Sequence, residues 1–258
     1  MGTPLHRVIL LPGSVLPAAP AYEKLIDALG GNVDAVAKDL EVYATPTPPP
    51  DYSLDTEVDG VLRTAAEKGW DTFHLVGYSG GGASALAFAA QHGARLRSLA
   101  LLEPAWAGRW DWSEAHRVLW QQYRDLEDLP DREFMARFVA LGVRPGVDAG
   151  LPRNDGPPPP WMAQRPAGIR AFVKTFQTYD LDRAALTRFD KPVYFALGAL
   201  SNPDDYGEIA DRLSHVFPDF HLDVFEQRHH FDPPHRIEPD RLAQALLTIW
   251  QRAEQSKP

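Results

Sequence analysis

A serine flanked by glycines, between a predicted strand and a predicted helix, is the feature that most constrains this chain. The segment reads Gly77-Tyr78-Ser79-Gly80-Gly81. Residues 72–76 before it, which are mostly apolar, predict a buried strand, and residues 83–90 after it, which are mostly small, predict a helix. A serine at such a turn sits on a strained bend with its hydroxyl exposed, and only small residues fit beside it. The pattern predicts that Ser79 is a nucleophile and that the Gly80 N–H, at a helix N-terminus, stabilises an oxyanion.

Short apolar runs alternate with helical patterns along most of the chain. Strands are expected at residues 8–11, 33–37, 72–76, 98–102, 192–197 and 220–225. Helices are expected at residues 21–29, 54–65, 80–92 and 237–252. This alternation predicts an α/β protein with a mostly parallel central sheet flanked by helices.

One long segment interrupts the alternation. It carries helical patterns near residues 113–126, 131–141 and 167–178, and a proline-rich stretch that cannot form regular structure. We interpret the segment as an inserted helical cap (lid). The predicted division is a core of residues 1–105 and 189–258 with a cap of residues 106–188.

The predicted cap holds five of the seven tryptophans of the chain. These rings are expected either to form an apolar lid over a substrate pocket or to form a small core inside the cap. Of the aromatic residues, we predict that four contact the substrate: Tyr78, Trp106, Trp110 and Trp161.

Composition excludes several classes of function. The chain has 258 residues, a net charge of -9 and no cysteine, so it cannot form a disulfide, a thiolate metal site or a cysteine nucleophile. It shows no basic patch for nucleic acid or an anionic membrane, no apolar stretch of membrane-spanning length and no signal-peptide pattern. We expect a cytoplasmic protein with a small-molecule substrate, either as a monomer or as a homo-oligomer.

Three motifs together resemble the α/β-hydrolase superfamily. They are Leu-Leu-Pro-Gly-Ser at residues 10–14, the segment around Ser79, and Arg-His-His-Phe at residues 228–231. The resemblance implies an α/β-hydrolase fold, a catalytic triad in the chain order nucleophile, acid, histidine, and no cofactor. It also implies that the first motif supplies the second oxyanion donor, although Pro12 stands where the family usually has histidine. We favour the N–H of Ser14, with that of Val15 as the alternative.

The histidine of the triad is expected in the loop after the last strand. His229 and His230 both lie there, and we favour His230 because it precedes an apolar residue, as is common in the family. These two and His235 form a group that could suggest a metal site. We expect no metal, since no matching carboxylate or histidine cluster is evident elsewhere in the sequence.

The acid is harder to assign. The position that aligns with the acid of many relatives is Ser201. We favour Glu103, at the end of the preceding strand, because a buried carboxylate at the carboxyl end of a parallel strand needs a partner such as an imidazole N–H. Asp204 and Asp205, in the next loop, remain the alternatives.

These residues predict a serine hydrolase that cleaves a small to medium apolar ester, lactone or thioester through an acyl-enzyme. The same scaffold also supports other reactions, so three alternatives stay open. They are a lyase or C–C bond hydrolase, a biosynthetic thioesterase, and a ligand-binding receptor with slow turnover.

Overall fold

A computed structural model describes residues 6–150 and 159–255 of the chain. Within them, six strands form one parallel sheet in the order β2-β1-β3-β4-β5-β6. The strands are β1 (His6–Leu11), β2 (Val33–Ala37), β3 (Phe73–Ser79), β4 (Leu96–Pro104), β5 (Val193–Gly198) and β6 (Phe220–Phe225). The mostly parallel sheet predicted from the sequence is therefore confirmed.

The strands are almost continuously apolar because both faces of the sheet are covered, as is usual for parallel sheets. Successive residues point to opposite faces. Ile9 and Leu75 belong to the hydrophobic cluster on one face, whereas Leu10 and Val76 belong to the cluster on the other.

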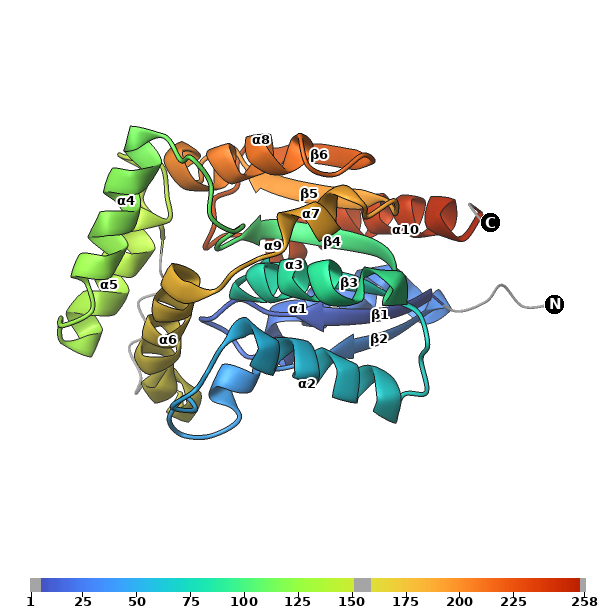
Figure 1. Cartoon of the computed structure of the whole chain (residues 1–258), viewed down its shortest axis with the longest axis horizontal. Helices are drawn as coiled ribbons and strands as arrows, with labels where there is room; N and C mark the ends of the chain where they lie inside the picture. Colours follow the sequence, from blue (N-terminus) through green and yellow to red (C-terminus); the bar gives the residue numbers. More distant parts are fainter. Residues whose placement is uncertain (1–5, 151–158, 256–258) are drawn as a thin grey trace.

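Helices cover both faces (Figure 1). One face carries α1 (Ala18–Leu29), α9 (Pro234–Ile237) and α10 (Pro239–Gln255), and the other carries α2 (Leu54–Glu67), α3 (Gly80–His92), α7 (Arg183–Thr187) and α8 (Glu208–Ser214). The short helices α7 and α8 were not predicted, because so few turns give a weak periodic signal. The predicted helix 237–252 is divided, since α9 ends before Glu238 and α10 begins at Pro239.

Three further helices lie between β4 and β5 in the chain: α4 (Glu114–Asp125), α5 (Asp131–Leu141) and α6 (Arg165–Thr178). They stand beyond the carboxyl ends of the strands, whereas the start of β1 and the end of α10 lie at the opposite end of the molecule (Figure 1). The three helices share a small apolar cluster that includes Tyr123, Phe134 and Ile169. The predicted proline-rich stretch falls mostly outside the described residues, and the boundaries 106–188 stay a prediction.

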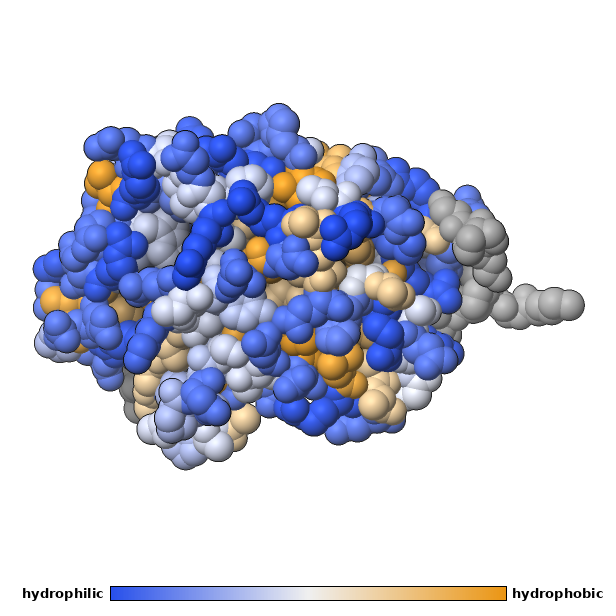
Figure 2. Space-filling model, in the orientation of Figure 1, coloured by the Kyte–Doolittle hydropathy of each residue, from blue (hydrophilic) through white to orange (hydrophobic). Residues whose placement is uncertain are grey.

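The surface seen in Figure 2 is mostly hydrophilic, with apolar residues scattered over it. The large apolar side chains that are exposed among residues 6–150 and 159–255 are Val118, Leu222 and Ile237. Over the same residues, every helix is too short or too polar to cross a membrane.

Close backbone packing fixes the junction between β3 and α3. A Cβ atom on Gly77 would overlap the backbone of Gly81, and a Cβ atom on Gly81 would overlap the carbonyl oxygens of Leu11 and Pro12. The N–H of Gly81 donates to the Pro12 carbonyl at 3.1 Å. The turn after β1 is therefore held directly against the start of α3.

We expect Gly81→Ala to lower the free energy of unfolding by about 1–3 kcal/mol, because the added methyl group meets backbone atoms that cannot move away easily. Gly31→Ala is the matched control, since nothing lies within 4 Å of its Cβ position. Urea unfolding of both variants measures the difference. Equal stability of the two variants would contradict this account of the turn.

Candidate active site

Ser79 occupies the bend between β3 and α3. Its backbone has φ 53° and ψ -118°, a conformation that residues with a side chain rarely adopt, and the first residue of α3 follows it directly. The side chain is nearly buried, with 6% of the residue exposed. The bend predicted around Ser79 is thus present, with the strain that a nucleophile elbow requires.

His230 lies in the loop after β6, and its two ring nitrogens face two predicted site residues. Nε2 is 3.0 Å from Oγ of Ser79, and Nδ1 is 3.1 Å from Oε2 of Glu103. His229 is directed differently, since its Nδ1 accepts the N–H of Phe231 at 3.2 Å. Of the two candidate histidines, the structure brings His230 into contact with Ser79.

Glu103 lies near the end of β4 and is 3% exposed. Its Oε1 accepts the N–H of Gly198, at the end of β5, at 2.7 Å, while Oε2 faces His230. Both oxygens of the buried carboxylate therefore have partners, which offsets the cost of removing the charge from water. Its φ of 46° is the second positive value at a non-glycine residue of the described chain, and both such residues belong to this site.

The aspartates considered as alternatives have other hydrogen-bond partners than His230. Asp204 is exposed, and its backbone carbonyl accepts the Nδ1–H of His116 at 2.8 Å. Asp205 is buried, and its Oδ1 accepts the Nε1–H of Trp120 at 3.2 Å. Ser201 is also buried, and its hydroxyl has no hydrogen-bond partner. Among these residues, Glu103 is the carboxylate that contacts His230.

Two tyrosines hold the imidazole of His230. The ring of Tyr206 stacks on it at 4.2 Å with an interplanar angle of 11°, and the ring of Tyr78 lies at 5.0 Å. The Tyr78 hydroxyl donates to the backbone carbonyl of His230. Burial raises the pKa of Tyr78 well above its usual value, so this hydroxyl keeps its proton. The histidine is fixed through its ring and its backbone together.

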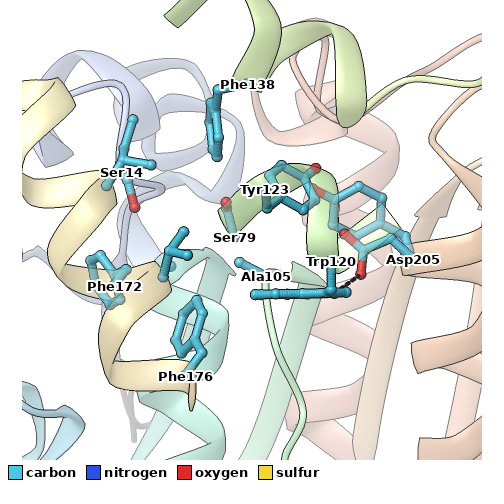
Figure 3. Close-up of a pocket in the computed structure, with 13 residues that line it drawn as sticks. Ser14, Ser79, Ala105, Trp120, Tyr123, Phe138, Phe172, Phe176 and Asp205 are labelled. Carbon is cyan, nitrogen blue, oxygen red and sulfur yellow. Dashed lines mark hydrogen bonds between the residues drawn. The ribbon is translucent and has the colours of Figure 1, made fainter. Parts of the chain in front are cut away.

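The two predicted oxyanion donors border the same cavity as Ser79 (Figure 3). Gly80 is the first residue of α3, where backbone N–H groups lack a partner within the helix. Ser14 follows the turn after β1, and its carbonyl accepts the hydroxyl of Tyr43 at 2.8 Å. Both residues thus lie at the wall of the cavity that contains Ser79, and their role as oxyanion donors stays a prediction.

The cavity beside Ser79 is small, with a volume of about 30 Å³, and its wall is largely aromatic. Most of this wall comes from α4, α5 and α6, which supply Trp120, Tyr123, Phe138, Ile169, Phe172, Val173 and Phe176. None of these seven residues is among those predicted from the sequence to contact the substrate. Aromatic enrichment of the region was the available signal, but it does not reveal which faces of the helices meet Ser79.

The four residues predicted to contact the substrate lie outside the wall of the cavity beside Ser79. Trp106 is buried in the main core and stacks on Phe176 at 5.3 Å, and Trp110 packs against Trp112. Tyr78 and Trp161 line a second, larger cavity of about 760 Å³. None of the four borders the cavity that contains Ser79.

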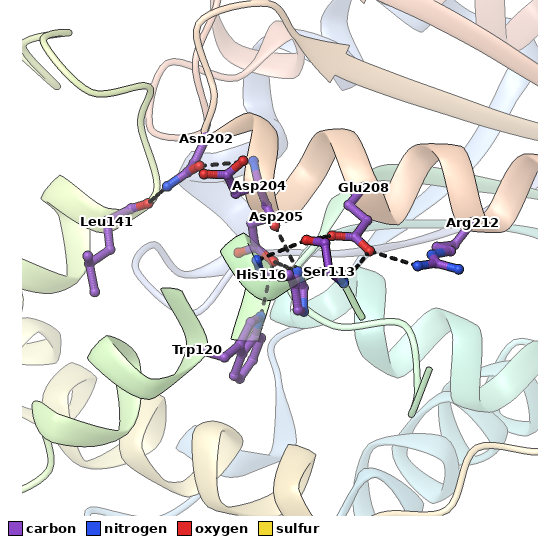
Figure 4. Close-up of polar contacts among 9 residues, drawn as sticks. All are labelled: Ser113, His116, Trp120, Leu141, Asn202, Asp204, Asp205, Glu208 and Arg212. Atoms are coloured by element: carbon purple, nitrogen blue, oxygen red, sulfur yellow. Dashed lines mark hydrogen bonds and ion pairs between the residues drawn. The ribbon is translucent and has the colours of Figure 1, made fainter. Parts of the chain in front are cut away.

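Asp205 brings a second carboxyl group to the wall of this cavity. Figure 4 shows it beside Trp120 and His116, whose Nδ1 is 3.8 Å from Oδ1. Burial, opposed by the hydrogen bond from Trp120, raises the pKa of Asp205 to about 7. Burial also lowers the pKa of His116, which keeps that ring neutral. The carboxyl therefore titrates near neutral pH, at the edge of an otherwise apolar wall.

Comparison with known proteins links this geometry to one family. The model of a family described as the α/β hydrolase fold matches residues 43–232. N-formylmaleamate deformylase from Pseudomonas putida is 31% identical over 105 residues, which are 40% of this chain and 39% of that protein. The matched part thus spans about two fifths of the relative.

Solved structures show the same fold. An esterase from Thermogutta terrifontis, solved with malate bound, has a TM-score of 0.69 at 18% identity and covers 97% of this chain and 91% of its own. MenH from S. aureus has a TM-score of 0.72 at 14% identity, with coverages of 98% and 96%. At such low sequence identities, these similarities show that the fold is shared and show nothing of the activity. The α/β-hydrolase fold predicted from the sequence is confirmed.

On the prediction that Ser79, His230 and Glu103 form a catalytic triad, we expect Glu103→Gln to lower kcat on an activated ester by about 10³–10⁴-fold, because an amide would not stabilise a positively charged imidazole. Asp204→Asn, at an exposed side chain of the next loop, should change kcat less than tenfold. Steady-state kinetics with p-nitrophenyl acetate measures both. A larger loss in Asp204→Asn than in Glu103→Gln would contradict the assignment of the acid.

The raised pKa of Asp205 predicts a pH dependence of stability. Between about pH 4 and pH 7 the folded protein keeps a proton on Asp205 that the unfolded chain has lost. As the pH rises through this range, the free energy of unfolding of the wild type should therefore fall, relative to that of Asp205→Asn, by up to about 1.4 kcal/mol per pH unit. The difference should level off above pH 7. Urea unfolding across this range checks the slope, and parallel curves for the two proteins would refute it.

Proposed function

This chain belongs to the α/β hydrolase fold family, and on that premise we propose that it is a serine hydrolase that cleaves a compact apolar ester, lactone or thioester through an acyl-enzyme. The observation that carries the proposal is the contact series from Glu103 through His230 to Ser79, which ends at a small cavity with a largely aromatic wall. The related esterase folds and the deformylase support hydrolysis as the class of reaction.

In the proposed reaction, Oγ of Ser79 attacks the substrate carbonyl carbon while Nε2 of His230 accepts its proton. Glu103 stabilises the imidazolium that results. The backbone N–H groups of Gly80 and Ser14 hold the oxyanion of the tetrahedral intermediate. His230 then protonates the leaving group, and a water molecule, activated by the same imidazole, releases the acid from Ser79. No cofactor takes part in these steps.

The size of the cavity supports a compact acyl group. A volume of about 30 Å³ corresponds to two or three buried water molecules on the usual scale. Phe172 and Phe176 of α6 and Trp120 of α4 lie around this space. We propose that α4, α5 and α6 act as a cap whose inward-facing rings set the accepted length of the acyl chain.

Hydrolysis of an N-formyl amide is the second candidate. It is favoured by the 31% identity to N-formylmaleamate deformylase and by the small cavity, since formyl is the smallest acyl group. The proposed chemistry is unchanged, because Ser79 would again attack a carbonyl carbon, with an amide in place of the alkoxide as the leaving group. The two candidates differ in the leaving group and in the acyl length that gives the highest rate.

We expect p-nitrophenyl esters to show kcat/KM that is highest at acetate or propionate and at least tenfold lower at octanoate, because the rings around Ser79 exclude long chains. Ser79→Ala should abolish turnover. Ser84→Ala is the matched control, since this buried serine of α3 donates to the Gly80 carbonyl at 3.0 Å and does not border the cavity. Assays with N-formyl amides in parallel decide between the two candidates.

Turnover that survives in Ser79→Ala would refute the proposed mechanism. Folded wild-type protein that hydrolyses neither esters, thioesters nor formyl amides would refute the proposed function. Cleavage of a diketone or cyanohydrin would then favour a lyase or C–C bond hydrolase, and saturable binding without turnover would favour a receptor.

A further inference from the structure

Three side chains with metal-binding atoms meet at the amino end of the sheet, away from Ser79. His6 begins β1, His74 is the second residue of β3, and Glu254 lies in the last turn of α10. Because the strands are parallel, the amino ends of β1 and β3 lie side by side, and α10 packs along the same face. Three residues that are far apart in the chain thus share one site.

The distances among their ligand atoms suit a small cation. Nδ1 of His6 is 3.1 Å from Oε1 of Glu254, a hydrogen bond that a metal ion would replace, and Nε2 of His74 is 3.6 Å from the same oxygen. All three groups present ligand atoms within 4.8 Å of one another. Ligands about 2.0–2.1 Å from a tetrahedral zinc ion lie about 3.3 Å apart, so modest side-chain adjustment brings the three atoms around one ion.

His74 supplies the second observation. The residue is fully buried, and its Nε2 has no hydrogen-bond partner, although it faces the carboxylate of Glu254. Its other nitrogen, Nδ1, is 2.8 Å from Oγ of Ser98. When Nδ1 carries the proton and donates it to Ser98, Nε2 presents a lone pair towards the carboxylate oxygen. Two lone pairs in that position repel each other unless a cation lies between them.

The surroundings hold the ring of His74 in place. Trp250 stacks on it at 5.0 Å with an interplanar angle of 24°. The Ser98 hydroxyl lies 2.8 Å from its Nδ1. A ring that is fixed in this way, with its second nitrogen hydrogen-bonded, is typical of a histidine ligand.

We propose that His6 Nδ1, His74 Nε2 and the Glu254 carboxylate bind a divalent transition-metal ion of the zinc type, with water as the fourth ligand. Two imidazoles and one carboxylate suit zinc, whereas calcium and magnesium prefer oxygen ligands alone. The bound ion links β1, β3 and α10. Because the unfolded chain does not hold these ligands together, the ion stabilises the folded state.

The test uses the full chain without a histidine tag, treated with a chelator and then dialysed against zinc. Metal content per chain, the visible absorption of added Co²⁺ and the Tm with and without Zn²⁺ are measured. We expect one equivalent of zinc, a tetrahedral Co²⁺ spectrum and a Tm rise of several degrees. Glu254→Gln and His6→Gln should each weaken zinc binding at least tenfold, and Ser98→Ala about 10–100-fold.

His215→Gln is the control, since this exposed histidine lies outside the cluster and should leave zinc binding unchanged. Circular dichroism spectra of the metal-free proteins show that each variant is folded before metal is added. The proposal is overturned when folded wild-type protein binds no zinc. It is also overturned when Glu254→Gln and His6→Gln bind zinc as tightly as His215→Gln, because the metal then lies elsewhere.

Discussion

The contact between the turn after β1 and the first residues of α3 is the constraint on which the site depends. The Gly81 N–H donates to the Pro12 carbonyl, and the two backbone segments lie so close that a side chain on Gly81 would not fit. The same contact places Ser14 beside Gly80 and holds Ser79 in a strained conformation. The proposed nucleophile and the two proposed backbone donors are thus positioned by main-chain packing, which side-chain motion cannot easily disturb.

Those features that depend on local patterns could be predicted from the sequence. The strand before Ser79, the bend and the small residues after it lie in one short segment, and parallel strands bring their carboxyl ends to one edge. That reasoning also led to Glu103, which the structure places against His230. Ser201, the position that aligns with the acid of many relatives, has a buried hydroxyl without a partner close to the end of β5.

The cavity walls could not be predicted in the same way. Helical periodicity located α4, α5 and α6 approximately, but the angle at which each helix stands over the sheet depends on packing between distant residues. Trp120 faces Ser79, whereas Trp106 stacks on Phe176 behind the wall. Both are tryptophans in one aromatic-rich segment, so composition alone does not distinguish them. The group of His6, His74 and Glu254 was not predicted from the sequence either, because its members are far apart in the chain and only the folded sheet brings them together.

The two contacts of the Glu103 carboxylate restrict which parts of the enzyme can diverge in sequence. One of its oxygens accepts a backbone N–H from β5 while the other faces the imidazole, so the carboxylate joins two strands as well as two parts of the site. A slip of β5 against β4 would turn the carboxylate and misalign the histidine with it. Alignment of the reacting groups is therefore tied to the register of the sheet. The helices α4, α5 and α6, which line the cavity, can diverge in sequence and tilt without disturbing the contacts of Glu103, His230 and Ser79 beneath them.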